Sequence, residues 1–546
     1  MIGRRAVLAA TGAGAVLPLL GCERAADITG GFTGISHERG HLLHEPPRNL
    51  TPGVTRRVHT LIAGGGVAGL AAARALRLQG RDDFALLELE DTAGGNSRAG
   101  SVQGIACPLG AHYLPLPGDD AREVQDLLEE LGLRRRVAGR WQYDERHLCH
   151  SPQERLFFNG EWQDGLLPLQ GVGAVTLGQY TRFAQRIAAI QRTSRFALPS
   201  FRAPFTPQHA ALDSMTFARW LDEEKLDDPH LRWYLDYCCR DDYGAGIATV
   251  SAWAGVHYFA SRHGFHAPGT DSSGEEREAG VLTWPEGNGW LTQRLAAPLG
   301  ERLHTGRVVL RVATTKHGVE VDALNTASQQ IERWQAAQCI LALPLFVAAR
   351  VLENPPPALV QAASALRYAP WLVANLHLKT ALHDRPGAAP SWDNVVYNAA
   401  NDPRFPGLGY VDARHQSLQT VPGETVLTYY RAFGLDPAQR QFLYDQPWSH
   451  WRDAVLAELS VPHPDLPDKA TRLEVMRYGH AMSVPVPGIR SSAALMALQK
   501  PLPAPWQRLQ FAHSDLAGYS VFEEAFGQGT RCGAVLSGLT RRGLNS

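Results

Sequence analysis

The sequence predicts an α/β fold in which a Rossmann-like nucleotide-binding domain is interleaved with an α+β substrate domain. Three observations lead to this prediction. A strand, a glycine-rich loop, a helix and a second strand follow one another between Thr60 and Leu89. Further strand segments come between 303 and 344, after a mostly helical stretch from about 117 to 280. The length of 546 residues is too great for one small core, so we expect two domains.

The first of these segments opens with an apolar run, Thr60–Ala63, which is typical of a buried parallel strand. The motif G-x-G-x-x-G follows, with its glycines at Gly64, Gly66 and Gly69, and then a helix over Leu70–Gln79. We expect the first glycine to permit a tight turn, the second to let the backbone approach a pyrophosphate, and the third to let the helix pack closely on the strand. The helix N-terminus then offers free N–H groups to the phosphates.

The second strand carries Glu88, at about the 20-residue distance where such folds place their ribose-binding acid. A carboxylate there accepts hydrogen bonds from a ribose 2′-hydroxyl and favours a free hydroxyl over a 2′-phosphate. A single G-x-G-x-x-G motif can arise by chance in a chain with 52 glycines. Strand, loop, helix, strand and acid in this order therefore predict dinucleotide binding.

The residues after Glu88 indicate which dinucleotide is bound. Leu87-Glu88, followed by Gly94-Gly95-Asn96, resembles the L-E-x-x-x-x-x-G-G-R segment of the flavin-containing amine oxidase superfamily. That group includes monoamine and polyamine oxidases, protoporphyrinogen oxidases and phytoene-type desaturases. The resemblance implies FAD, with Gly95 and Asn96 at its flavin end. Asn96 replaces the family's arginine, which removes one cationic contact to the cofactor.

Later segments extend the resemblance. Cys107–Tyr113 looks like the family segment whose backbone passes along the isoalloxazine ring, which implies that His112 and Tyr113 are flavin neighbours. The alternative for His112 is that it only satisfies a backbone group. Val308 corresponds to the residue whose backbone meets the adenine. Near the C-terminus, Leu509–Asp515 resembles the F-A-G-[DE] motif, whose acid approaches the ribityl chain and phosphate.

That C-terminal match departs from the family in two ways. His513 stands where the family has glycine, and Asp515 comes one or two places late. No cysteine lies near Asp515–Tyr519 to attach a flavin, so we expect the FAD to be non-covalent. The resemblance divides the chain into the following parts: a signal at 1–22, a linker at 23–55, an FAD-binding domain at 56–116 with 281–350 and 501–546, and a substrate domain at 117–280 with 351–500.

The first residues predict export. Arg4-Arg5 precedes an apolar run, Ala6–Leu20, that is too short to span a bilayer comfortably. The paired arginines fit a twin-arginine signal, and Leu19–Cys22 resembles the lipobox of bacterial lipoproteins. The alternative is an ordinary secretory signal that happens to contain a cysteine. We therefore expect a location in the periplasm or cell envelope, with a possible lipid anchor at Cys22.

Composition excludes several classes of partner and site. The net charge is −1 without a basic run, so nucleic acid is not expected as a partner. The seven cysteines are scattered without C-x-x-C spacing, so we predict no metal site, and we interpret Cys238 and Cys239 as small buried residues. Two interpretations remain for His37, His41 and His44 in the linker. They bind a metal ion, or they belong to a polar segment that packs on the enzyme.

The resemblance implies an FAD-dependent oxidoreductase that takes a hydride from a small molecule to flavin N5, from an amine C–N bond or from a C–C bond. We expect His112, Tyr113 and Tyr519 to contact the substrate, and Asp241-Asp242-Tyr243 could also line its pocket. The usual lysine near N5 is missing from the matching stretch, Tyr368–Leu376. Two alternatives remain: a non-catalytic FAD-binding partner or chaperone of another envelope protein, and a nicotinamide-dependent dehydrogenase.

The export signal can be tested directly. Arg4→Lys with Arg5→Lys should trap the FAD-loaded protein in the cytoplasm, because the twin-arginine route reads the arginine pair itself. Cys22→Ala should release the exported protein from membranes. Cell fractionation followed by immunoblotting measures both effects. Normal export of the double lysine variant would contradict the twin-arginine assignment.

Overall fold

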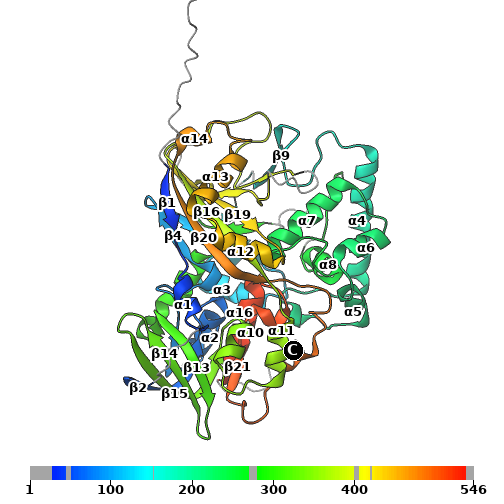
Figure 1. Cartoon of the computed structure of the whole chain (residues 1–546). Coiled ribbons are helices and arrows are strands. Elements are labelled where there is room, and N and C mark those ends of the chain that lie inside the picture. The colour runs from blue at the N-terminus through cyan, green and yellow to red at the C-terminus, as the bar shows by residue number, and fades with distance from the viewer. Residues whose placement is uncertain are drawn as a thin grey trace, which may run out of the picture.

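The computed structural model describes most of the chain, and two large sheets organise it (Figure 1). The described residues are 28–44, 51–149, 151, 153–262, 264–269, 280–398, 405–417 and 421–536. The predicted signal, with Cys22, lies outside them. No helix among the described residues has the length and apolar character needed to cross a membrane.

The first sheet contains seven strands in the described part of the chain and lies in the lower half of Figure 1. Its path runs β12-β3-β2-β15-β14-β13, and β21 pairs with β15. The pairs among β12, β3, β2, β15 and β21 are parallel, whereas β13, β14 and β15 form antiparallel pairs. The bounds are β2 Val54–Ala63, β3 Phe84–Leu87, β12 Leu303–His304, β13 Arg307–Thr314, β14 Val319–Asn325, β15 Gln330–Leu341 and β21 Leu509–Phe511.

Helices cover both faces of this sheet because its central strand is apolar on both sides. Leu61 and Ile62 are both 0% exposed, and as neighbours in a strand they point to opposite faces. Ile62 packs with α2 (Val67–Leu78), α3 (Arg122–Glu130), α9 (Gly289–Ala296) and α16 (Phe522–Leu536). Leu61 packs with α10 (Leu345–Val351), α11 (Pro357–Ala365) and α15 (Ala493–Leu498). This is the doubly covered parallel sheet expected of a Rossmann-like domain.

The second sheet contains eight strands among the described residues, in the order β1-β20-β16-β19-β18-β17-β9-β10. Their bounds are β1 Thr29–Phe32, β9 Glu154–Phe158, β10 Glu161–Asp164, β16 Tyr368–Leu378, β17 Asp393–Val396, β18 Tyr410–Asp412, β19 Thr425–Ala432 and β20 Ala470–Ser483. A group of helices lies beside it, at the right of Figure 1: α4 Ala174–Thr193, α5 Pro207–Asp213, α6 Phe217–Glu223, α7 Pro229–Tyr243 and α8 Ala252–Ala260. These helices and the sheet share one aromatic core.

Shorter elements complete the described fold. Helices α12 (Pro437–Asp445), α13 (Trp448–Leu459) and α14 (Leu466–Lys469) lie near the second sheet (Figure 1). Strands β4 (Ala99–Val102) and β5 (Ile105–Pro108) form one hairpin, and β7 (Arg134–Val137) and β8 (Arg140–Tyr143) form another. Strand β6 (Tyr113–Pro115) pairs with β11 (Val281–Thr283), which joins the two halves of the chain.

The structure differs from the expected linker within 28–44. Here Thr29–Phe32 forms β1, which pairs in parallel with Arg472–Val475, and His37–His41 forms helix α1. A Cβ at Gly30 would lie 1.8 Å from the Leu473 carbonyl oxygen, so glycine lets this strand approach the sheet edge. A four-residue strand joined through its backbone shows no alternation of apolar and polar residues, which is why the sequence did not predict it.

The structure also bears on the predicted histidines and cysteines. No group of His, Cys, Asp or Glu in the described part of the chain could hold a metal ion, and the rings of His37 and His41 lie 3.7 Å apart. Cys238 and Cys239 are buried free thiols, as expected.

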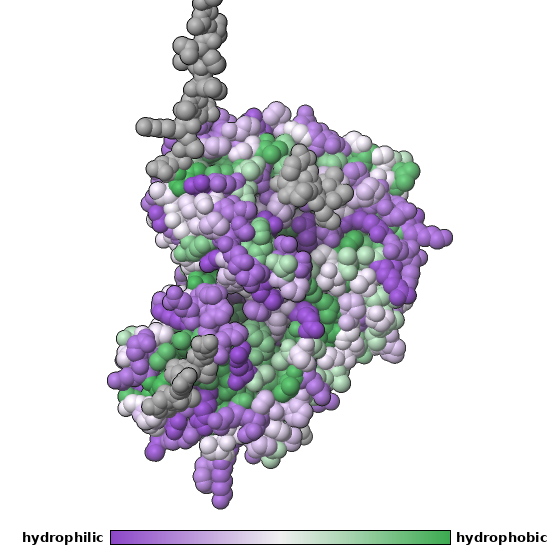
Figure 2. Space-filling model, in the orientation of Figure 1, coloured by the Kyte–Doolittle hydropathy of each residue, from purple (hydrophilic) through white to green (hydrophobic). Residues whose placement is uncertain are grey.

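Large apolar side chains on the surface are scattered, and on the face seen in Figure 2 they alternate with hydrophilic residues.

Close packing of α16 on α2 gives a test of this fold. A Cβ at Gly529 would lie 2.0 Å from the Ala68 carbonyl oxygen. Gly529→Ala should therefore cost about 1–3 kcal/mol of overpacking, more than the helix propensity that alanine adds. Gly178→Ala is the control, because no atom lies within 4 Å of a Cβ there. A melting temperature that falls for Gly178→Ala but not for Gly529→Ala would contradict this packing.

Candidate functional site

The glycine loop between β2 and α2 forms a cradle at the carboxyl edge of the first sheet. Gly64 has a φ of +104°, and a Cβ there would lie 2.2 Å from the Ala342 carbonyl oxygen. A Cβ at Gly69 would lie 1.9 Å from the Gly64 carbonyl oxygen. The protein's own packing thus requires glycine at both positions. Gly66 differs, because a Cβ there would meet only the Gly95 Cα, at 3.9 Å.

Glu88 closes one side of this cradle. Its carboxylate accepts hydrogen bonds from the backbone N–H groups of Gly65, at 2.7 Å, and Glu90, at 2.9 Å. Burial raises the pKa of Glu88, and the two backbone hydrogen bonds oppose that rise. Glu88 therefore shapes the loop through its own contacts, at the place where the sequence predicts a ribose-binding acid.

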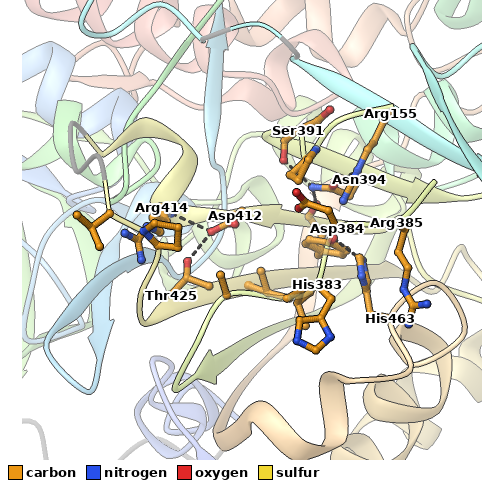
Figure 3. Close-up of a pocket in the computed structure, with 17 residues that line it drawn as sticks. Arg155, His383, Asp384, Arg385, Ser391, Asn394, Asp412, Arg414, Thr425 and His463 are labelled. Atoms are coloured by element: carbon orange, nitrogen blue, oxygen red, sulfur yellow. Dashed lines mark hydrogen bonds between the residues drawn. The ribbon is translucent and has the colours of Figure 1, made fainter. Parts of the chain in front are cut away.

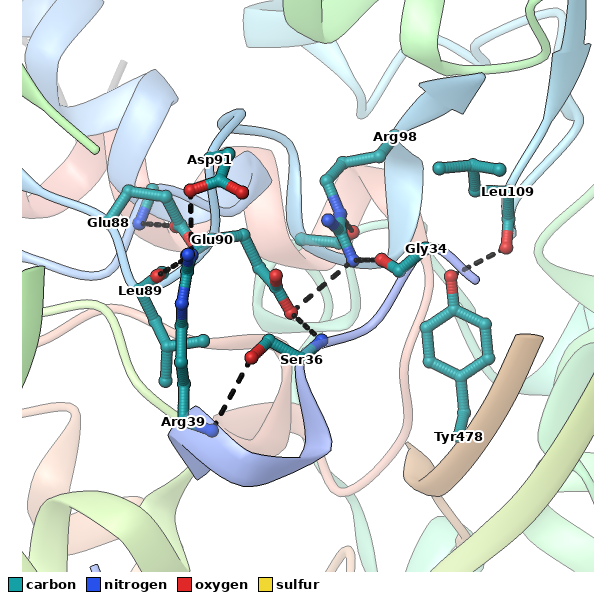
Figure 4. A network of polar contacts seen from close by, with 12 residues as sticks. Gly34, Ser36, Arg39, Glu88, Leu89, Glu90, Asp91, Arg98, Leu109 and Tyr478 are labelled. Atoms are coloured by element: carbon teal, nitrogen blue, oxygen red, sulfur yellow. Dashed lines mark hydrogen bonds and ion pairs between the residues drawn. The ribbon is translucent and has the colours of Figure 1, made fainter. Parts of the chain in front are cut away.

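The N-terminal segment braces the residues after Glu88 (Figure 4). The Glu90 carboxylate accepts from the Ser36 backbone N–H at 3.0 Å. Arg39 donates to the Leu89 carbonyl oxygen and pairs with Asp91 at 2.8 Å. Since β1 belongs to the second sheet, residues 28–44 connect that sheet to the ribose end of the cradle. No sequence pattern predicted these contacts.

Gly95 and Asn96 lie on the opposite wall, in a 3-10 turn over Gly95–Ser97. The Asn96 side chain donates to the Ala481 carbonyl oxygen at 2.6 Å, and its own carbonyl accepts from the Ala111 N–H at 2.8 Å. Asn96 thus ties the cradle to β20 and to the segment before His112.

Val308 and Asp515 reach the same region from distant parts of the chain. Val308 is 1% exposed and packs in one small cluster with Leu89. Asp515 is 0% exposed and accepts from the Leu345 N–H, at the start of α10, at 2.9 Å and from the Tyr368 hydroxyl at 2.6 Å. Burial opposes ionisation of Asp515, but the charge of His513 and these hydrogen bonds lower its pKa overall.

His112 and Tyr113 lie where the first domain meets the second sheet. The His112 ring stacks on Tyr430 with 4.3 Å between centroids, and burial lowers its pKa to about 3, so the imidazole is neutral. The Tyr113 hydroxyl donates to the Asp241 carboxylate at 3.2 Å. The Asn288 side chain donates to the Tyr113 carbonyl oxygen at 2.8 Å and so fixes the backbone of this segment.

Three carboxyl groups gather beside this pair, and we call Glu154, Asp241 and Asp393 the acidic cluster. Burial raises the pKa of Glu154 to about 7. Burial and the neighbouring charge of Asp242 raise the pKa of Asp241 to about 7 as well. Burial and the charges of Asp241 and Glu154 also raise the pKa of Asp393 well above its ordinary value. All three side chains nevertheless keep part of their surface accessible.

Only Asp241 in this cluster was a candidate from the sequence. Glu154 and Asp393 lie far apart along the chain, and the parallel pairing of β9 with β17 sets them opposite each other. The signal they share is a carboxylate at the first position of a short strand, followed by one polar residue and then by apolar residues.

Tyr519 occupies a different environment from His112 and Tyr113. Its side chain is 1% exposed and packs edge-on against Tyr243, with 5.8 Å between centroids. Its hydroxyl donates to Glu524 at 2.6 Å. The structure therefore places Tyr519 in the core, and its contact with a substrate stays a prediction.

The residues of the cradle fit FAD. The first-turn N–H groups of α2 have no partners within the helix and face the side where Gly66 leaves room for a phosphate. Gly64, Gly66, Gly69, Glu88, Gly95 and Asn96 come together there, and Val308 and Asp515 lie at the same edge of the sheet. His112 and Tyr113 stand between this cradle and the acidic cluster.

Comparison with characterised proteins agrees with this geometry. The model of the family described as flavin containing amine oxidoreductase matches residues 67–536. An L-amino acid dehydrogenase of Synechocystis is 31% identical over 151 residues, 28% of this chain and 29% of that protein. AofH of Mycobacterium tuberculosis, which carries the name of a flavin-containing monoamine oxidase, is 26% identical over 311 residues, 56% of this chain and 62% of that protein. The chain thus spans less than two thirds of either relative.

Solved structures share the fold. Putrescine oxidase bound to putrescine superposes with a TM-score of 0.63 at 18% identity, over 89% of this chain and all of that chain. Cyclohexylamine oxidase from Brevibacterium oxydans gives 0.63 at 16% identity with the same coverage. The cofactor is FAD, which this family normally holds without a covalent bond. With the family model matching most of its length, the chain belongs to the flavin-containing amine oxidoreductases, a family of FAD-dependent oxidoreductases.

Proposed function

We propose that this protein oxidises the C–N bond of a small cationic amine and passes the hydride to FAD. The observation that carries the proposal is the acidic cluster of Glu154, Asp241 and Asp393, placed beside the aromatic pair His112 and Tyr113. An ammonium group is the natural partner of accessible carboxylates in a partly buried site. Putrescine oxidase and cyclohexylamine oxidase, which share the fold, act on molecules of this class by their names.

The acidic cluster can also accept the proton that the substrate loses. An amine must lose its ammonium proton before its carbon can give up a hydride. A carboxyl group with a pKa of about 7 exchanges protons readily near neutral pH, and Asp241 and Glu154 both have that property. Bound FAD supplies the hydride acceptor, while His112, Tyr113 and the cluster bind the amine and hold its proton.

A neutral substrate with a C–C bond is the competing chemistry within the family. A pocket for such a molecule has no need of three carboxyl groups, because each costs free energy to bury without a cation. Anaerobic mixing with diamines, amino acids and polyenes distinguishes the two. Bleaching of the flavin by amines alone supports the proposal, and bleaching by polyenes alone overturns it.

We further propose that the enzyme acts in the periplasm or cell envelope. The Arg4-Arg5 pair and the Leu-Leu-Gly-Cys box support this location. Folding with FAD before export fits a route that carries folded proteins, and a lipid at Cys22 would hold the enzyme at the membrane.

The cradle gives a prediction about the cofactor. Gly66→Leu should yield a folded but colourless protein, because the new side chain would fill the space beside the α2 N-terminus. Absorbance near the flavin band, with circular dichroism for folding, measures this. Gly118→Leu should stay yellow, since no atom lies within 4 Å of a Cβ there. Acid precipitation of the wild type should release all the flavin.

A second prediction concerns pH. Above a pKa of about 7 Asp241 is ionised and attracts the cationic amine, and below it the group is neutral, so kcat/KM should rise with pH through about 7. Asp241→Asn should lower kcat/KM about tenfold or more at pH 8 and flatten the rise, by loss of a charged hydrogen bond. Tyr113, Asp242 and the Arg262 that pairs with Asp242 at 3.0 Å surround this group.

Glu458 offers a matched control for that experiment. Burial raises its pKa to about 7 as well, but it binds the Tyr429 hydroxyl at 2.7 Å, away from the acidic cluster. Glu458→Gln should leave the pH profile unchanged. An unaltered profile in Asp241→Asn would show that this carboxyl group does not meet the substrate.

A further inference from the structure

A cavity of about 290 Å³ lies on the outer side of the second sheet (Figure 3). Three arginines line it, Arg155, Arg385 and Arg414, together with Tyr410, His463 and two carboxylates, Asp384 and Asp412. Its volume suits a small metabolite rather than a peptide. Neither the family resemblance nor the proposed amine oxidation assigns it a role.

Strand alternation separates this cavity from the acidic cluster. In β9 Glu154 is followed by Arg155, and in β17 Asp393 is followed by Asn394. The register pairs the two acids with each other and Arg155 with Asn394. Because successive side chains point to opposite faces, the acids face the interior and Arg155 with Asn394 faces the cavity. The same two strands thus carry negative groups on one face and a positive group on the other.

Arg155 is a buried charge without a counter-charge. It is 4% exposed, donates to the Asn394 side chain at 2.6 Å and to the Ala388 carbonyl oxygen at 3.2 Å, and stacks 4.0 Å over Trp162. These partners are neutral. The described residues include no ion pair that involves Arg155, whose contacts are with neutral groups. A buried cation is expected to be paired, so the cavity beside it is suited to an anion.

His463 adds a hydrogen-bond donor that lacks an acceptor in the described structure. It is 2% exposed, its Nε2 lies 2.7 Å from the Tyr410 hydroxyl, and its Nδ1 has no hydrogen-bond partner in the described structure. Burial and the charge of Arg155 lower its pKa to about 3, so the ring is neutral. The positive charge of Arg155 beside Tyr410 favours donation of the hydroxyl proton away from the arginine, to Nε2. Nδ1 then carries the ring hydrogen and lacks an acceptor.

We propose that this cavity binds a small molecule through an oxyanion, either a carboxylate or a phosphate, held by Arg155 and His463. Arg385, which also lies 3.9 Å from the Asp465 carboxylate, adds a second cation. Asp412, at the other end of the cavity, already accepts from the Thr425 hydroxyl and the Arg414 backbone N–H. Figure 3 shows Asp412 with Arg414 and Thr425 on one side, and Arg155, Arg385 and His463, together with Asp384, on the other. The oxyanion therefore binds at the end away from Asp412.

Calorimetry on the FAD-loaded enzyme tests this site. Succinate and inorganic phosphate are titrated separately at constant ionic strength, with succinamide as the neutral analogue of succinate. We expect saturable binding of one or both anions and none of succinamide. Binding of succinate alone identifies a carboxylate site, and binding of phosphate alone identifies a phosphate site.

Variants link the binding to the cavity. Arg155→Gln should weaken anion binding about tenfold or more, the usual effect of losing a charged hydrogen bond. Arg134→Gln is the matched control, because Arg134 is 5% exposed and stacks 3.7 Å over Trp141 but does not line the cavity. Flavin absorbance reports folding, and Arg385→Gln replaces Arg155→Gln if the latter loses its FAD. Absence of saturable binding, equal binding of succinamide, or wild-type affinity in the folded cavity variant overturns the proposal.

Discussion

The fold depends on a chain of backbone contacts that only glycine permits. Gly69 lies against the Gly64 carbonyl, Gly64 against the Ala342 carbonyl, and Gly529 against the Ala68 carbonyl. These contacts bring together α2, the end of β15 and α16, which are separated by hundreds of residues. Each distance is too short for any side chain, so the cofactor cradle and the packing of the domain are set by the same atoms. Gly66 differs from these glycines because the nearest atom to a Cβ placed there is the Gly95 Cα, at 3.9 Å.

The second sheet carries groups of opposite charge on its two faces. Its strands β9 and β17 are short and directly paired, so each presents one acid inward and one polar group outward. A backbone hydrogen bond to each inner acid, and the part of its surface that stays accessible, offset part of the cost of burying it. On the outer face Arg155 rests on neutral partners.

The extent of the sequence predictions follows from how local each feature is. The unit from Thr60 to Glu88 is contiguous, and its turn, helix and acid are visible as a pattern. His112 and Tyr113 could be placed beside the cofactor only through a family segment. Glu154 and Asp393 could not be paired, because their meeting depends on a parallel strand pairing between distant segments. Tyr519 shows the remaining difficulty, since an aromatic residue gives no sign of whether it lines a pocket or fills a core.

The absence of a lysine from β16 leaves the question of which group handles protons near the substrate. His112 is neutral, with a pKa of about 3, because burial disfavours its charged form. Burial and the charge of Asp241 raise the pKa of Tyr113 above its ordinary value, so the hydroxyl keeps its proton. Only the carboxyl groups titrate near neutrality, at about 7 for Asp241 and Glu154. Under the proposed amine oxidation, proton acceptance would therefore fall to the acidic cluster, which would also supply the charge that an amine requires.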